Sequence, residues 1–163
     1  MMFNFNAAEV FKVGVKIEEN GKAFYEKALR VVDNPEIKKL FEELALEEVG
    51  HKRKFEELLA QLPPRATEAT VWDPQNETDL YIKMMADQHV FVGGESIETQ
   101  VSRLRDVKDA LKLAINFEKD SVIFFLTVQD ATDETKGREF IGQLVKEEQE
   151  HLRRLSLELK KLG

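Results

Sequence analysis

Residues 44–51 read LALEEVGH, and residues 144–151, one hundred positions later, read LVKEEQEH. In each segment a glutamate is followed three residues later by a histidine, which gives the pairs Glu48–His51 and Glu148–His151. Residues three apart lie on one face of a helix, so both side chains of a pair can reach one point. Two of the three histidines of the chain occur in this spacing, which favours a common binding point over two unrelated surface pairs.

Both segments lie inside longer stripes of apolar residues that recur at steps of three and four. This period is typical of one core-facing side of a helix. It predicts helices over residues 35–62 and 135–162, and each carries its Glu–His pair in the middle of the apolar face. The first stripe consists of Phe41, Leu44, Phe55, Leu58 and Leu62, and the second of Ile141, Leu144, Leu155 and Leu162.

Two further helices are predicted, over residues 7–32 and 105–129. Their apolar stripes are each interrupted by one glutamate, Glu18 or Glu118, again one hundred positions apart. The surrounding segments, IEENGKAFYEKA at 17–28 and FEKDSVIFFLTV at 117–128, also resemble each other. The chain therefore contains an internal duplication of a helical hairpin. A carboxylate in a buried stripe is costly unless a cation balances it.

The connections between these helices predict how they are arranged. Short breaks join the members of each pair, so residues 7–62 and 105–162 form two antiparallel hairpins. Residues 63–104, which include a short helix at about 79–90, are long enough to cross the bundle from end to end. We therefore predict one all-α domain over residues 1–163, a four-helix bundle with the long crossover of ferritin-like topology.

The bundle would bring four carboxylates and two imidazoles together. Such a set is typical of carboxylate-bridged two-metal sites in bundle cores. Two divalent ions would balance the four negative charges. Mixed oxygen and nitrogen ligation suits iron or manganese, and it is less specific for zinc. We predict two iron ions, with manganese or a mixed pair as the alternative. The predicted metal ligands are Glu18, Glu48, His51, Glu118, Glu148 and His151, and the four glutamates are also the predicted catalytic residues.

Spacing assigns no single role to the residues beside this set. Tyr25 follows Glu18 on the same face, so its hydroxyl could hydrogen-bond a ligand carboxylate, and plain core packing is the alternative. We expect His89, which has no partner motif, to be structural or exposed. The neighbouring acids fall off the apolar stripes, where they would face solvent or pair with Lys and Arg; they are Glu19, Glu47, Glu147 and Glu150.

Composition limits the partners. The chain has 163 residues, a formal net charge of −7 and no cysteine. An acidic protein lacks the basic face that nucleic acids and anionic membranes require, and no apolar run is long enough to span a membrane. The absence of cysteine excludes iron–sulfur clusters and rubredoxin-type iron within this sequence. We expect a cytoplasmic protein. Apolar Phe3, Phe5 and Val10 suggest a homodimer contact.

The motifs resemble those of the rubrerythrin branch of the ferritin-like superfamily. IEENGKAFYEKA resembles the first-helix glutamate motif, EEVGH and EEQEH the Glu-x-x-His motifs, and FEKDSVIFF the third-helix motif. The resemblance implies that Glu18 and Glu118 are terminal carboxylate ligands, and that Glu48 and Glu148 bridge the metals. It also implies one histidine ligand for each ion and an activity towards hydrogen peroxide or dioxygen at di-iron.

The sequence departs from that family in two places. Rubrerythrins proper carry a rubredoxin-like domain with four cysteines, so here electrons would come from an external reductase or electron-transfer protein. They also carry a further glutamate three residues after the first one in the third helix, where this chain has Ser121. Our leading hypothesis is a di-iron oxidoreductase acting on peroxide or dioxygen, and a variant of it would oxygenate an organic substrate. Iron storage with ferroxidase activity and a non-enzymatic metal-binding module are the alternatives.

Overall fold

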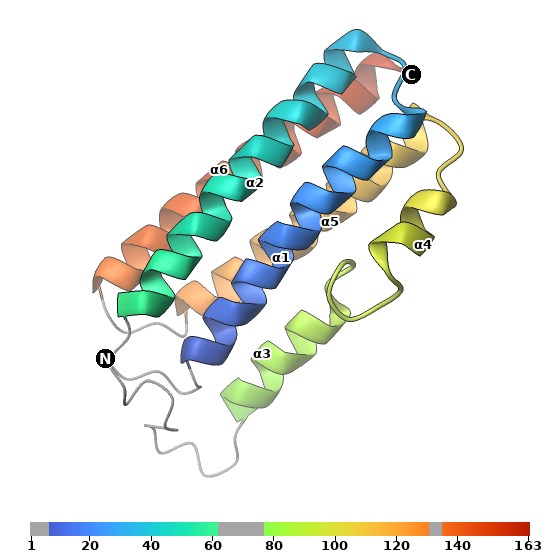
Figure 1. Ribbon diagram of the computed structural model, residues 1–163. Coiled ribbons are helices and arrows are strands. Elements are labelled where there is room, and N and C mark those ends of the chain that lie inside the picture. Colours follow the sequence, from blue (N-terminus) through green and yellow to red (C-terminus); the bar gives the residue numbers. More distant parts are fainter. Residues whose placement is uncertain (1–6, 62–76, 131–134) are drawn as a thin grey trace.

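The computed structural model describes residues 7–61, 77–130 and 135–163, and these ranges are mostly helical and contain no strands. Four long helices, α1, α2, α5 and α6, lie side by side, and the short helices α3 and α4 run along one side of them (Figure 1). The elements are α1 (Ala7–Ala28), the 3-10 turn η1 (Leu29–Val31), α2 (Pro35–Gln61), α3 (Glu77–Gln88), α4 (Ile97–Ser102), α5 (Val107–Asp130) and α6 (Thr135–Lys161).

The arrangement confirms the predicted all-α, ferritin-like fold. Helices α1 and α2 run in opposite directions and pack closely together, as do α5 and α6 (Figure 1). The segment between the pairs starts at the end of α2 and reaches the start of α5 at the opposite end of the bundle. The two hairpins therefore face each other with α1 beside α5 and α2 beside α6, and the space between them is the bundle core.

Capping residues mark where α2 and α5 begin, and α2 starts at Pro35 as predicted. Asn34 caps α2, because its Oδ1 accepts hydrogen bonds from the backbone N–H groups of Glu36 (2.9 Å) and Ile37 (3.2 Å). Helix α5 begins at Val107 rather than at 105, since the Oδ1 of Asp106 accepts from the N–H of Asp109 at 2.9 Å. The α-helical part of α1 ends at Ala28, and a 3-10 turn continues the chain to the break.

The crossover contains a second short helix that periodicity did not predict. Helix α4 is only six residues long, and Ser96 caps it by accepting a hydrogen bond from the N–H of Thr99. Arg30, just after α1, donates to the carbonyl oxygens of Val101 and Leu104 at the end of α4. The crossover is thereby tied to the first hairpin.

The loop after α3 is held against both hairpins by side chains in matching places of the repeat. Asn20 of α1 donates to the carbonyl of Phe91 at 2.5 Å, and Asp120 of α5 accepts from the N–H of Val90 at 3.0 Å. These bonds hold the Phe91 ring against Phe24 and Phe117, with ring centroids 4.9 Å apart in both pairs. The loop thus closes the α1–α5 side of the core.

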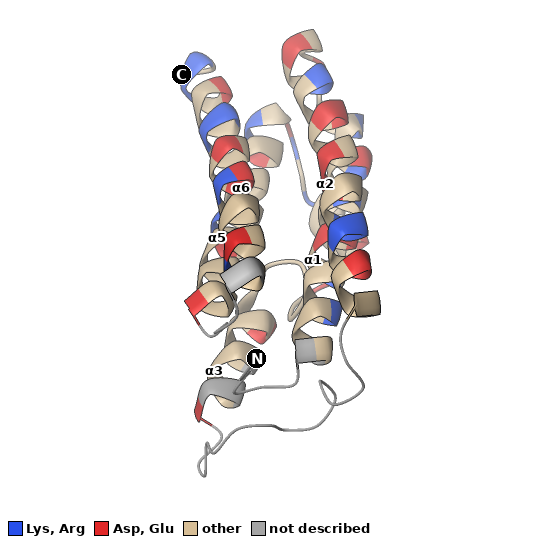
Figure 2. Cartoon of the chain, turned by 90° about the vertical axis from the view of Figure 1, so that its left-hand side faces the viewer, with Lys and Arg blue, Asp and Glu red and all other residues tan. Residues whose placement is uncertain are grey.

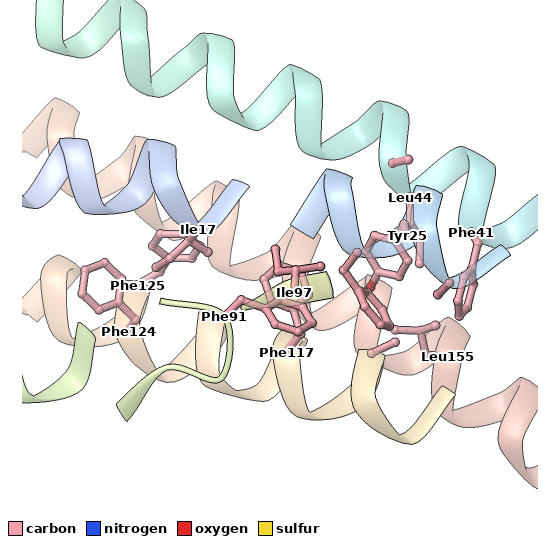
Figure 3. Packing of buried hydrophobic residues seen from close by; sticks show 14 of the residues in the cluster. Ile17, Tyr25, Phe41, Leu44, Phe91, Ile97, Phe117, Phe124, Phe125 and Leu155 are labelled. Atoms are coloured by element: carbon pink, nitrogen blue, oxygen red, sulfur yellow. The ribbon is translucent and has the colours of Figure 1, made fainter. Parts of the chain in front are cut away.

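The core is rich in aromatic side chains, which Figure 3 shows meeting between the helices. Gly21 permits the closest approach within it. A Cβ atom at this position would lie 2.5 Å from the ring of Phe117 and 3.4 Å from the carboxyl carbon of Glu48. Because real Cβ atoms do not approach other atoms that closely, a larger residue at 21 would displace Phe117 beside the buried carboxylates.

The outer surface carries charges of both signs. Basic and acidic residues are interspersed along α2 and α6 (Figure 2), and several form ion pairs, such as Lys52–Glu19 at 3.0 Å and Arg154–Glu43 at 2.7 Å. Within the described ranges, none of the helices is both long and apolar enough to cross a membrane.

The suggested homodimer contact receives no support from the surface. Val10 is only 5 % exposed, because it packs into the core of its own chain. Phe3 and Phe5 lie outside the described residues. The homodimer therefore stays a prediction.

Candidate metal centre

The structure brings the six predicted ligands together in the middle of the bundle. Their ligand atoms form two overlapping groups, and the atoms of each group lie within 4.8 Å of one another. Each long helix contributes: α1 gives one glutamate, α5 gives one, and α2 and α6 each give a Glu–His pair. One group is Glu18, Glu48, His51 and Glu148, and the other is Glu48, Glu118, Glu148 and His151.

Most polar atoms of this cluster are buried without hydrogen-bond partners. Each of the six side chains is at most 3 % exposed. Among the described residues, the buried side-chain nitrogen and oxygen atoms that lack a hydrogen-bond partner all belong to these six residues. Buried polar atoms are normally satisfied, so such a concentration requires an explanation. The donor set of four carboxylates and two imidazoles, with its free lone pairs directed inward, fits two divalent metal ions.

In the metal-free cluster, burial and neighbouring carboxylates make ionisation of the terminal glutamates unfavourable. Burial, together with the neighbouring Glu48 and Glu148, raises the pKa of Glu18 well above its usual value. Burial and the same two carboxylates likewise raise the pKa of Glu118. For Glu148, burial acts in the raising direction, but contact with the imidazoles of His151 and His51 outweighs it and lowers the pKa. Protons and metal ions would therefore compete for this site.

Both histidines present Nδ1 to the cluster. The Nδ1 of His51 lies 2.8 Å from Glu148 Oε1 and 3.4 Å from Glu18 Oε2. The Nδ1 of His151 lies 3.4 Å from Glu148 Oε2 and 3.5 Å from Glu118 Oε1. Burial alone would lower the pKa of each imidazole, but the adjacent carboxylates raise the pKa of both. A metal ion would replace the proton on Nδ1.

The other nitrogen of each histidine is held by a glutamate for which the sequence predicts a position facing solvent or paired with Lys or Arg. His51 Nε2 donates to Glu147 Oε2 of α6 at 2.6 Å, and His151 Nε2 donates to Glu47 Oε2 of α2 at 2.7 Å. The contacts are reciprocal, since each helix supplies a histidine and the acid that orients the other helix's histidine. Such carboxylates fix the ring orientation and raise the basicity of the ligating nitrogen.

Spacing placed Glu47 and Glu147 one residue off the apolar stripe, and both are indeed partly exposed. Their role could have been found from the Glu-Glu-x-x-His pattern, which occurs in both halves of the repeat. The other two neighbouring acids form ion pairs with basic residues, as expected: Glu19 with Lys52 and Glu150 with Arg153.

Tyr25 makes the predicted contact with a ligand carboxylate. Its hydroxyl donates to Glu118 Oε1, across the core from its own helix α1 to α5. Burial and the neighbouring Glu118 raise the pKa of the phenol, so the hydroxyl remains a donor. The hydrogen bond fixes one oxygen of Glu118 and leaves Oε2 without a partner.

His89 is buried, not exposed, and it forms a polar pair with Ser121 beside the cluster. The backbone N–H of Phe91 donates to His89 Nδ1 at 3.2 Å, so Nε2 carries the proton and donates to Ser121 Oγ at 3.0 Å. Burial lowers the pKa of this histidine to about 4. A neutral His–Ser pair thus lies at Ser121, the third-helix position at which the sequence departs from the rubrerythrin motif that it resembles.

This buried histidine should make the metal-free protein less stable in acid. A histidine has a pKa of about 6.5 when unfolded. The unfolded chain therefore binds a proton that the folded chain refuses between pH 6.5 and pH 4, and the stability that is present above this window is lost as the pH falls through it. When the pH falls from 7.5 to 4.5, the unfolding free energy of the parent protein should fall by about 2–3 kcal/mol more than that of the His89→Gln variant. Urea titrations at the two pH values measure both falls. Equal losses would contradict a neutral buried His89.

Comparison with known proteins agrees with this geometry. The family model described as Rubrerythrin matches residues 9–159, which is most of the chain. The chain belongs to the rubrerythrin family. The matched range contains both hairpins of the rubrerythrin fold and all six residues of the candidate centre.

A solved structure supports the same fold for this rubrerythrin-family chain. It is that of a Thermotoga maritima protein, described as ferritin-like and diiron-carboxylate, with 22 % sequence identity and a TM-score of 0.76. The similarity covers 100 % of both chains. A search of curated proteins gave no match. Family and structure thus identify a rubrerythrin-type, ferritin-like bundle whose buried Glu and His cluster could bind metal.

Proposed function

We propose that the protein is a di-iron oxidoreductase that reduces hydrogen peroxide or dioxygen with electrons from an external donor protein. The observation that carries the proposal is the buried cluster of six side chains whose inward oxygen and nitrogen atoms have no hydrogen-bond partners among the described residues. Two bound ferrous ions would supply the two electrons that, with two protons, convert hydrogen peroxide into two water molecules.

The four glutamates would have two different roles in holding the ions. Glu48 and Glu148 belong to both ligand groups, so they would hold the two ions at a fixed separation. Glu18 and Glu118 each belong to one group and would complete its ligands. Manganese, alone or with iron, is compatible with the same donors.

Residues around the cluster would set its geometry and exclude water. Glu47 and Glu147 orient the two imidazoles, and Tyr25 orients Glu118. Phe117 stands between the centre and the crossover loop, where it contacts the rings of Phe91 and His89. This apolar wall favours reaction with a small, neutral oxidant such as peroxide or dioxygen over a charged substrate.

The electrons would come from outside the bundle, since the bundle has no cysteine to hold a rubredoxin-type iron. A donor that approaches the surface needs a short path to the centre. The histidine-supporting acids Glu47 and Glu147 are partly exposed and lead directly to the imidazoles, so the α2–α6 side is the side at which we expect electrons to arrive.

Peroxide titration of ferrous-loaded protein without oxygen tests the proposal. We expect rapid oxidation that ends at one peroxide per two iron ions, and renewed consumption after each addition of reductant. The Glu48→Ala/Glu148→Ala variant, mixed with the same amount of iron, should react no faster than free ferrous iron.

Two outcomes would contradict the proposal. Growth of a ferric mineral far beyond two ions per chain would instead indicate iron storage with ferroxidase activity. Binding of two ions without any acceleration of peroxide or dioxygen consumption would indicate a metal-binding module that has no enzymatic role.

A further inference from the structure

The two metal-binding groups have unequal surroundings, although they derive from a repeated hairpin. In one group Glu118 accepts a hydrogen bond from the Tyr25 hydroxyl. The residue one hundred positions after Tyr25 is Phe125, which has no hydroxyl, and both carboxylate oxygens of Glu18 lack a hydrogen-bond partner. One terminal carboxylate is therefore fixed before metal binds, and the other is not.

The two histidines also differ in how firmly their acidic partners are held. The better-held histidine, His151, belongs to the same group as Glu118. Glu47, which holds His151, is itself held by Arg154, whose Nη1 donates to Glu47 Oε1 at 3.0 Å. The guanidinium is also anchored by Glu43 at 2.7 Å, so His151 stands at the end of a connected chain of charged groups.

His51 has a looser support. Glu147, the glutamate that accepts from His51, has Lys54 as its basic neighbour. In the repeat, Lys54 occupies the position that corresponds to Arg154. The Nζ of Lys54 lies 3.6 Å from Glu147 Oε1, and the lysine side chain is 46 % exposed, against 23 % for Arg154. A lysine makes a flexible point contact where an arginine makes a planar, preorganised one.

Access from solvent is also unequal. A cavity of about 330 Å³ between α2 and α6 is lined by His51, and Gly50 forms part of its wall, where an added Cβ would meet no atom within 4 Å. A second cavity of about 330 Å³, between α1 and α2, is lined by Glu18 and Glu48. Neither lining includes Glu118 or His151. Glu48 is shared by both groups, and the unshared ligands that the openings reach, His51 and Glu18, belong to the same group.

We propose that the two metal positions are functionally distinct. The open position, formed by Glu18 and His51 with the shared glutamates, exchanges its divalent ion with solvent and is the first to meet peroxide or dioxygen. The closed position, formed by Glu118 and His151 with the same shared glutamates, retains its ion. This inference rests on the proposed function insofar as it takes the cluster to hold two ions.

Metal release from protein loaded with two Co²⁺ ions per chain tests the inference, because Co²⁺ can be followed by its visible absorption. After addition of an excess of chelator, we expect two phases of one ion each. The Tyr25→Phe variant should accelerate the slow phase by about 10–100-fold and leave the fast phase unchanged, because it removes a ligand-orienting hydrogen bond from the closed position only. The exposed Tyr81 provides the matched control, and Tyr81→Phe should change neither phase.

Two single-position variants assign the phases. Glu18→Ala should abolish the fast phase and keep one slowly released ion, and Glu118→Ala should do the reverse. Release of both ions with one rate constant, acceleration of the fast phase by Tyr25→Phe, or the opposite assignment would overturn the inference while leaving a two-metal centre intact. Failure to bind two ions at all would instead count against the proposed function. If Glu118→Ala does not fold, the Tyr25→Phe arm still decides the matter, since that substitution removes one oxygen atom.

Discussion

Loading the metal-free protein with Mn²⁺ is expected to raise its unfolding temperature by about 10 °C. Metal binds the folded cluster, whose ligands are dispersed in the unfolded chain, so binding free energy becomes folding free energy. At a free concentration a thousand times the dissociation constant, this gain is about 4 kcal/mol. For a chain of this size, each kcal/mol corresponds to about 2–4 °C.

Thermal unfolding followed by circular dichroism measures this effect. Mg²⁺ at the same concentration is the control, because it prefers oxygen ligands and retains water, so it should give a much smaller shift. The Glu48→Ala/Glu148→Ala variant should show no Mn²⁺-dependent shift, since both ligand groups lose two members. Equal shifts with Mn²⁺ and Mg²⁺, or an unchanged shift in the variant, would show that the ions act elsewhere on this acidic chain.

Replacing the two terminal glutamates together, Glu18→Gln and Glu118→Gln, should stabilise the metal-free protein while weakening metal binding. Burial and neighbouring carboxylates raise the pKa of both residues in the folded state. A raised carboxyl pKa means that stability is full at low pH and is lost as the pH rises from the unfolded pKa towards the folded one. At pH 7 the wild-type chain bears this cost and the glutamine variant does not.

We expect the metal-free variant to gain about 1–3 kcal/mol of unfolding free energy at pH 7, and less at pH 4. Glutamine retains an oxygen that can accept the hydrogen bond from Tyr25, so the packing is kept. Glu19→Gln is the matched control, since this acid is 43 % exposed and paired with Lys52. Its effect should stay within about 0.5 kcal/mol. A double variant that is less stable than the parent without metal would contradict the electrostatic description of the cluster.

The sequence was sufficient to predict the four long helices and the six residues that meet in the core. The reason is that each residue of the set interrupts an apolar stripe, and burial of a stripe directs its polar members to the same place. The repeat of one hundred positions strengthened the prediction of these residues, because Glu48–His51 and Glu148–His151 occupy matching places in two hairpins.

Contacts that depend on the relative placement of helices could not be predicted in the same way. Glu47 and Glu147 lie one residue off their stripes, and they reach the histidines only because α2 and α6 pass each other at this level. Helix α4 has just two buried apolar residues, Ile97 and Val101, which are too few to reveal a helical period. The burial of His89 results from the crossover loop folding over α5.

If the six side chains hold two metal ions, the amount of bound metal per chain shows it most directly. Protein reconstituted with ferrous iron without oxygen, then freed of excess metal, should contain two iron ions per chain by elemental analysis. The Glu48→Ala/Glu148→Ala variant, treated identically and shown to be folded by circular dichroism, should contain none. An absence of stoichiometric metal in the parent protein, or two ions retained by the variant, would contradict the claim.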